Sequence, residues 1–256
     1  MTGWRECHHV RGVPDGVAGA ATHWVIGWNV VRSVDDADGG YRDPYGDDLY
    51  DEADGSTETL AHLGPLAPMA GVWEGVKGYD LHPSVTGPEG DTFVEHYDLQ
   101  PIDRQTNGPQ LFYGLRYHTH IVRPGETETF HDQVGYWLWE PSAHLVTFTL
   151  SIPRGQVLLA AGAAEATSRH FVVSATLGSE THGILSNPFL DRAFRTRRFE
   201  MSVSIHEDGT WSYDEVAELE IPGQPGVFRH VDANTLTRVA SPSGNPLAGG
   251  VAGVVS

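Results

Sequence analysis

Short runs of β-branched and aromatic residues follow one another along most of this chain, and they constrain its fold more than any other feature. The runs are residues 92–99, 111–122, 127–139, 145–152, 156–162, 169–177, 198–206, 210–221 and 228–239. Turn sequences at hairpin spacing separate them, for example Pro153-Arg154-Gly155 and Glu207-Asp208-Gly209. No long amphipathic helix alternates with these runs, which argues against a parallel α/β fold. The pattern therefore predicts an all-β meander of antiparallel strands.

The N-terminal part of the chain has a different composition. Residues 33–56 are dominated by Asp, Gly and Tyr, so they can bury little apolar surface. The acidic run between Asp43 and Asp54 suggests calcium, but it lacks the alternating ligands and central glycine of an EF-hand loop and is better explained as a solvated linker. We expect an irregular acidic extension over residues 1–60, a barrel over 61–240 and a flexible tail over 241–256. Trp24 and Trp28 can dock the extension on the barrel or on a second subunit.

Charge and cysteine content exclude several classes of function. Lys and Arg number 16 against 34 Asp and Glu, and the formal net charge of -18 disfavours binding to nucleic acids and to anionic membranes. The single cysteine, Cys7, rules out an intramolecular disulfide framework and fits a reducing compartment. Neither a signal peptide nor an 18-residue apolar stretch is present. We therefore expect a cytoplasmic protein.

His230, near the C-terminus, lies in a segment whose pattern predicts a strand. In a regular strand, His230 shares a face with Phe228, Asp232, Asn234 and Leu236. In a closed sheet that face can point into the lumen, where a neutral imidazole is a residue type that ligates haem iron. The competing interpretation is a core or surface histidine with no ligand role. A single histidine has no characteristic spacing to other ligands of the kind that identifies a zinc motif.

The segment from Leu63 to Gly75 predicts the closed end of a barrel. A short helical turn comes first, and the first strand then begins Gly71-Val72-Trp73-Glu74-Gly75. The two glycines permit close backbone approach, and Trp73 can fill the floor of the barrel. This is a structural motif that requires no chemistry.

Gly-x-Trp-x-Gly at the start of a β-meander resembles the opening of the lipocalin and fatty-acid-binding superfamily. More closely it resembles the nitrobindin family of haem-binding β-barrels, which includes the haem domain fused to THAP zinc fingers. The run Phe130-His131-Asp132-Gln133-Val134-Gly135-Tyr136-Trp137 is similar to that family's His-x-Glu-x-Gly-Tyr-aromatic strand. His230 falls where the family has its proximal haem ligand, and the resemblance covers roughly residues 63–240.

The resemblance implies an up-and-down antiparallel β-barrel of about ten strands that binds ferric haem b. His230 would be the axial iron ligand, and His131 the catalytic residue on the distal side. Phe130, Gly155 and Trp73 would complete the cofactor-binding set. The implied reactions are with nitric oxide and with peroxynitrite, which family members isomerise to nitrate, and pairing into a homodimer is left open.

Several positions depart from the family pattern. Gln133 stands where the family strand often has Glu, and residues 178–197 are longer than expected. The surround of His230 is more polar than in the family, and Asp232 can either orient the imidazole or face solvent. Arg154 can meet a haem propionate or remain an exposed turn residue.

Two other functions are compatible with the same barrel. In the first, the lumen carries an apolar small molecule without iron. In the second, zinc binds to His118 and His120, which share a strand face at spacing i, i+2. The zinc site would need a third ligand from His131, His96 or Glu95.

Overall fold

The computed structural model describes residues 43–244 of the chain, and residues 1–42 and 245–256 lie outside the described part. It contains two short α-helices, one 3-10 helix and twelve strands. These elements are α1 (Thr59–His62), η1 (Gly64–Met69), β1 (Gly71–Ser84), β2 (Gly87–Pro101), β3 (Gln105–Asn107), β4 (Gln110–Val122), β5 (Thr129–Glu140), β6 (Leu145–Ile152), β7 (Gln156–Ala163), β8 (His170–Thr176), β9 (Ile184–Ser186), α2 (Pro188–Ala193), β10 (Arg195–Ile205), β11 (Trp211–Glu220) and β12 (Val227–Ala240).

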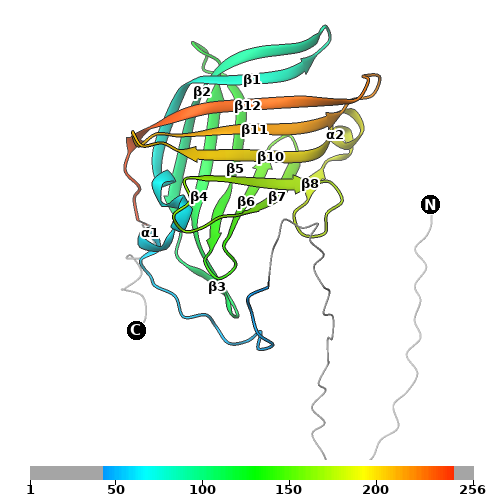
Figure 1. Ribbon diagram of the computed structural model, residues 1–256. Coiled ribbons are helices and arrows are strands. Elements are labelled where there is room, and N and C mark those ends of the chain that lie inside the picture. The colour runs from blue at the N-terminus through cyan, green and yellow to red at the C-terminus, as the bar shows by residue number, and fades with distance from the viewer. Residues whose placement is uncertain (1–42, 245–256) are drawn as a thin grey trace, which may run out of the picture. The chain divides into compact units, whose positions relative to one another are not determined.

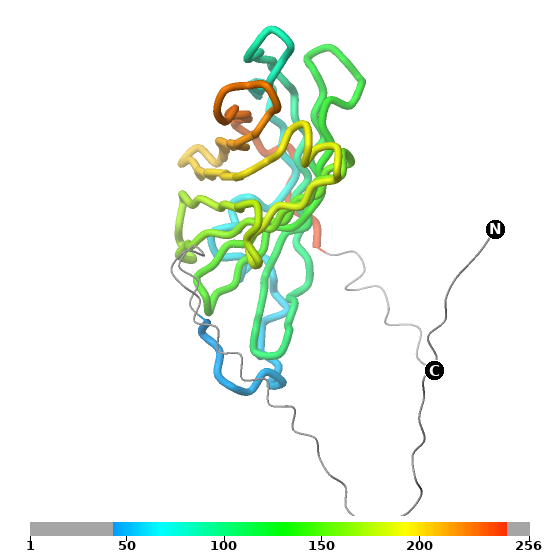
Figure 2. Tube along the Cα trace, turned by 90° about the vertical axis from the view of Figure 1, so that its right-hand side faces the viewer, coloured from blue at the N-terminus to red at the C-terminus, as the bar shows by residue number. Residues whose placement is uncertain are grey.

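Antiparallel pairing carries the chain around a closed ring. The order runs β2-β1-β12-β11-β10-β8-β7-β6-β5-β4, and pairing of β2 with β4 closes it (Figures 1 and 2). Closure removes the exposed edges that an open sheet would leave. The predicted all-β antiparallel barrel of about ten strands is confirmed. The short strands β3 and β9 pair with β4 and β7 outside this ring and were not expected from the sequence.

The predicted floor of the barrel is present. The helical turn is η1, and its neighbour Trp73 is fully buried and donates its indole N–H to the carbonyl of Met69 at 2.7 Å. Trp211 packs edge-on against Trp73 with ring centroids 6.1 Å apart, and the Arg238 guanidinium lies 4.6 Å from the Trp73 ring centroid. Trp73 therefore anchors the aromatic core at this end of the barrel.

Two glycines of the sequence motifs allow side chains and strands to approach closely. A Cβ atom on Gly75 would lie 2.2 Å from Asn234, which occupies the space beside that backbone. A Cβ atom on Gly135 would lie 2.0 Å from the carbonyl oxygen of Thr149, where β5 passes β6. Both contacts are far below van der Waals separation, so neither position tolerates a side chain.

The long segment after β8 covers part of the lumen. It contains β9 and α2, and the Asn187 side chain caps α2 by accepting a hydrogen bond from the Leu190 N–H at 2.9 Å. Leu190 and Phe194 line the internal cavity described below. Part of the stretch 178–197, which is longer than the family pattern, therefore forms a short helix beside the lumen.

Residues 43–58 precede the first helix and have no helix or strand. The segment contacts the barrel through one side chain and one backbone group: the Tyr45 hydroxyl donates to the Glu140 carboxylate, and the backbone N–H of Ser56 donates to the Tyr113 hydroxyl at 3.0 Å. The rest of the predicted extension, including Trp24 and Trp28, lies outside the described residues.

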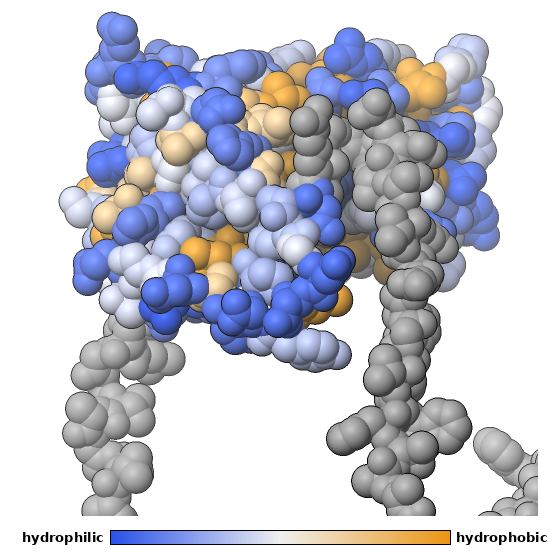
Figure 3. Space-filling view, turned by 60° about the horizontal axis from the view of Figure 1, so that its bottom comes forward, coloured by the Kyte–Doolittle hydropathy of each residue, from blue (hydrophilic) through white to orange (hydrophobic). Residues whose placement is uncertain are grey.

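The face shown in Figure 3 is rich in hydrophilic residues, with apolar patches scattered among them. Among the described residues, no helix has the length and apolar character needed to cross a membrane.

Replacing Gly135 with alanine is expected to destabilise the fold by more than about 2 kcal/mol, because the added methyl group collides with the Thr149 backbone and the strands must separate. Chemical denaturation of the variant and the wild type measures the difference. Gly46→Ala is the matched control, since nothing lies within 4 Å of its added Cβ, and it should change stability by less than about 0.5 kcal/mol. Equal losses in the two variants would contradict the close-approach role of Gly135.

Candidate functional site

An internal cavity of about 410 Å³ lies in the lumen and brings together the two histidines singled out from the sequence. His131 comes from β5 and His230 from β12, and β1, β2 and β4 separate these strands in the ring. The cavity has an apolar part, to which strands β5–β7, β10 and β11 contribute Phe130, Leu150, Ile152, Leu158, Phe199 and Leu219. It also has an acidic part around His230.

A directed chain of hydrogen bonds fixes His131. The Tyr117 hydroxyl donates to the Thr149 carbonyl at 2.9 Å, so it can only accept from the Gln133 side-chain NH₂, also at 2.9 Å. The Gln133 side-chain oxygen must then accept from His131 Nε2–H, at 3.2 Å. Because the carbonyl sets the direction of the whole chain, His131 carries its proton on Nε2 and keeps Nδ1 as a free acceptor.

Burial lowers the pKa of His131, although the Gln133 contact opposes this shift. Nearby positive charge on Arg154 and His230 lowers that pKa further. His131 is therefore neutral at physiological pH, which is the state in which an imidazole accepts a proton or ligates a metal.

His230 has a different environment, because carboxylates surround it. His230 Nε2 lies 2.7 Å from Asp80 Oδ1 and 3.4 Å from Asp232 Oδ2. Burial would lower the pKa of His230, but the hydrogen bond to Asp80 and the charge on Asp232 raise it above its usual value. The sequence left open whether Asp232 orients the imidazole or faces solvent; the structure places it in the lumen, and Asp80, which was not predicted, makes the shorter contact.

Strand register explains the acidic part of the cavity. Glu215 on β11 pairs with Asp232 on β12, and Asp232 pairs with Asp80 on β1. Asp80 in turn pairs with Asp91 on β2, so four carboxylates follow one another across neighbouring strands. Because the first three line the cavity, they bring negative charges together out of water.

Burial and mutual repulsion favour the protonated forms of Glu215 and Asp232. Burial, reinforced by the charge on Asp232, raises the pKa of Glu215 to about 8. Burial raises the pKa of Asp232 to about 6 despite the opposing effect of His230. Asp80 behaves oppositely: burial works against its ionisation, but the contacts with His230 and His82 hold its pKa below the usual value.

A fourth luminal carboxylate, Glu95, is buried beside this group. Its Oε2 atom accepts hydrogen bonds from the Tyr213 hydroxyl and the Asn234 amide, each at 2.9 Å. Burial raises the pKa of Glu95 to about 7 even so. Asn234, which the sequence placed on the His230 face, is thus a partner of Glu95.

The other predicted site residues divide into two groups. Phe130 and Arg154 line the cavity, and the Arg123 guanidinium lies 4.4 Å from the Phe130 ring centroid. Trp73 and Gly155 do not line it. Trp73 fills the floor, and Gly155 lies in the turn between β6 and β7 at φ +83°.

The histidine pair considered for zinc lies on the outer face of the barrel. His118 contacts Asp132 at 3.0 Å, and His120 contacts Thr129 at 3.1 Å, while Thr119 between them is buried. Within residues 43–244, neither histidine belongs to a cluster of three ligand side chains. Of the suggested third ligands, Glu95 and His131 face the lumen instead.

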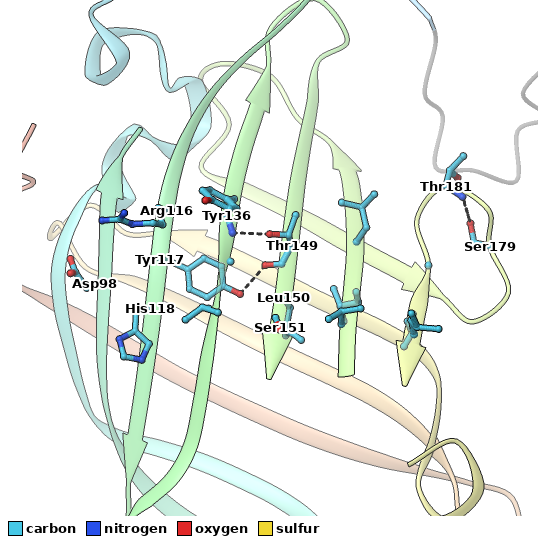
Figure 4. A pocket seen from close by; sticks show the side chains of 18 of the residues that line it. Asp98, Arg116, Tyr117, His118, Tyr136, Thr149, Leu150, Ser151, Ser179 and Thr181 are labelled. Carbon is cyan, nitrogen blue, oxygen red and sulfur yellow. Dashed lines mark hydrogen bonds between the residues drawn. The ribbon is translucent and has the colours of Figure 1, made fainter. Parts of the chain in front are cut away.

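A larger hollow of about 1090 Å³ lies on the outside, over β4–β7 and β9. Figure 4 shows the Tyr117 ring reaching the Thr149 carbonyl at its base, with His118 and Tyr136 nearby. The hollow contains neither His131 nor His230, and Tyr117 connects its base to the hydrogen-bond chain of the lumen.

Comparison with known proteins agrees with this architecture. Residues 62–238 match the family model described as "THAP4-like, heme-binding beta-barrel domain". Rv2717c from M. tuberculosis, known from a crystal structure, is similar in fold at a TM-score of 0.50 and 19% identity. That alignment covers 72% of this chain and 99% of Rv2717c. No curated protein matched the sequence.

The buried carboxylates are expected to make the ligand-free protein less stable as the pH rises from about 5 to about 8, by about 1–3 kcal/mol. Glu95, Glu215 and Asp232 have folded-state pKa values of about 7, 8 and 6, above their ordinary values of 4.5, 4.5 and 3.8. The folded state therefore holds more protons than the unfolded state in this interval, and His230, whose pKa is also raised, acts in the same direction. The lowered pKa of His131 has the opposite effect on the pH dependence of stability. It is one group against the four whose pKa values are raised.

Urea denaturation across this pH range measures how the free energy of unfolding changes with pH. Glu215→Gln should flatten this dependence, because the amide has no proton to lose. Stability that increases with pH in the wild type would contradict the pKa shifts.

Replacing Gln133 with glutamate is expected to raise the pKa of His131 by about one unit or more, because a carboxylate would then accept the Nε2–H bond. NMR titration of the His131 ring in the ligand-free protein measures this. Gln105→Glu adds the same charge at an exposed position on β3 and should leave the pKa of His131 unchanged.

Proposed function

The chain belongs to the THAP4-like, haem-binding β-barrel family, and from this we propose that it binds haem b in the lumen with His230 as the axial ligand. The observation that carries the proposal is the position of His230 in the lining of the luminal cavity, with a carboxylate held against one ring nitrogen. Cys7, the single cysteine, supports placing this function in the reducing cytoplasm.

The cavity has the size of a ligand pocket, and one of its walls is apolar. Its volume of about 410 Å³ falls among those of ligand pockets in proteins, roughly 300–1,000 Å³. Phe130, Leu150, Ile152 and Phe199 supply an apolar surface for a macrocycle. Arg154 also lines the cavity, and its guanidinium suits a propionate carboxylate.

The contact between His230 and Asp80 supports a ligand role. Metal-bound histidines commonly direct their second ring nitrogen to a carboxylate, which sets the tautomer and strengthens the metal bond. At 2.7 Å, Asp80 holds His230 Nε2 in this way, and Nδ1 remains for a metal. Because the pKa of His230 is raised, protons compete with a metal for this ring, and we expect haem binding to weaken at low pH.

His131 supports a role on the opposite side of the cavity. Its Nε2–H is committed to Gln133, and its Nδ1 can accept a hydrogen bond from a small ligand. We propose nitric oxide and peroxynitrite as those ligands, with peroxynitrite isomerised to nitrate. Bound ferric haem would supply the Lewis-acidic iron for this reaction, while the closed barrel limits access of water and His131 orients the ligand.

Haemin titration of the purified protein, followed by the Soret band, tests the proposal. The wild type should saturate at one haem per chain, and His230→Ala should lose at least about tenfold in affinity because the axial bond is gone. Asp80→Asn should weaken binding less, since the ligand remains and only its carboxylate partner is lost.

His170→Ala is the matched control, because His170 is exposed on β8 and contacts only Ser204 among the described hydrogen bonds. It should bind haemin as the wild type does. Equal Soret titrations of wild type and His230→Ala would reject His230 as the ligand. With haem bound, faster decay of peroxynitrite to nitrate, reduced in His131→Ala, would support the isomerase reaction.

A further inference from the structure

We propose that the haem-free protein binds a divalent transition-metal ion at Asp80, His230 and Asp232, and that this ion competes with haem for His230. The cation site is independent of the proposed function, and only the competition rests on it. The ligand atoms of the three residues lie within 4.8 Å of one another, in a cluster that needs only small shifts to enclose an ion.

The backbone explains why these three side chains converge. Asp80 and Asp232 are directly paired on β1 and β12. His230 precedes Asp232 by two residues on the same strand, so both side chains point to the same face. The ligands thus come from two hydrogen-bonded strands of a closed barrel, which hold them more rigidly than loops would.

The negative charge of the cluster favours binding of a cation. Two carboxylates and a neutral imidazole carry a charge of about -2 when the carboxylates are ionised, which a divalent ion neutralises. Among the described ion pairs, Asp80 and Asp232 pair with histidines alone and with no Lys or Arg. No permanent positive charge therefore occupies the place that the ion would take.

Glu215 supplies an independent observation. It is paired with Asp232 in register and lines the same cavity. The side chain is partly buried, and its carboxylate accepts no hydrogen bond from any of residues 43–244. A carboxylate that lines the cavity and has no donor among these residues can serve as a fourth ligand or accept from a water on the ion.

The donor set indicates which ion would bind. One imidazole nitrogen with two or three carboxylate oxygens suits ions of intermediate hardness such as Mn²⁺, Fe²⁺, Co²⁺ and Zn²⁺. The absence of thiolates from the cluster disfavours Cu⁺, and the imidazole disfavours Ca²⁺ and Mg²⁺, which prefer all-oxygen sites.

A neighbouring cluster of Asp80, His82 and Asp91 is less suitable. Its ligand atoms are equally close, but the Arg123 guanidinium already pairs with Asp91 at 3.2 Å. We therefore assign His82 a supporting role. It holds Asp80 Oδ2 at 2.8 Å and leaves Oδ1 directed to His230 and the ion.

Titration of the haem-free protein with Co²⁺, followed by visible absorption, tests the site. We expect a saturable band at one Co²⁺ per chain and at least tenfold weaker binding in Asp232→Asn. Asp132→Asn is the matched control: Asp132 contacts His118 on the outer face, and this variant should bind Co²⁺ as the wild type does. Glu215→Gln, which keeps the shape of the side chain, is a second variant expected to weaken binding.

Haemin titrations with and without Co²⁺ then separate the two proposals. Saturable Co²⁺ binding and a higher apparent haemin Kd in its presence would support the inference. Haemin binding without a saturable Co²⁺ site, or Co²⁺ binding that Asp232→Asn leaves intact, would overturn the cation site and spare the haem proposal. Co²⁺ binding without haemin binding would reject the haem proposal and retain the cation site.

Discussion

Pairing of β2 with β4 is the constraint on which the other features of this protein depend, because it turns a meander into a closed ring. Closure forces alternate side chains of every strand into one lumen with limited access to water. Groups that are distant in sequence, such as Asp80 and His230, then meet at 2.7 Å. Low solvation in that lumen gives Glu95 and Glu215 their high pKa values and keeps His131 neutral.

Local pattern was sufficient to predict most of the fold. The strand at residues 145–152 begins and ends where its alternation and flanking turns indicate, because a short half-buried strand carries its own signal. The other predicted runs end within three residues of the observed strands, except that β2 begins five residues before the predicted run 92–99. β3 and β9, of three residues each, are too short to show periodicity. Both luminal histidines were also predicted, one from its strand and both from the family motifs.

The acidic part of the cavity was not predictable in the same way, since it depends on register between strands far apart in sequence. Asp80 and Asp232 face each other only because β1 shifts register between Glu74 and Tyr79, and no short-range pattern encodes that irregularity. Trp73 and Gly155 show what a sequence motif leaves open. Their motifs marked real structural positions, but a motif alone does not tell whether a residue supports the barrel or touches its contents.

The chain of hydrogen bonds from His131 through Gln133 to Tyr117 ends on a backbone carbonyl, and this gives it a fixed polarity. A peptide carbonyl has no proton to return and does not hold one at neutral pH, so the chain is a dead end for proton transport. A proton that reaches His131 Nδ1 therefore cannot leave through the wall along this chain and can leave only on the cavity side. The hydrogen-bond chain in the barrel wall therefore orients His131 without conducting protons across the wall.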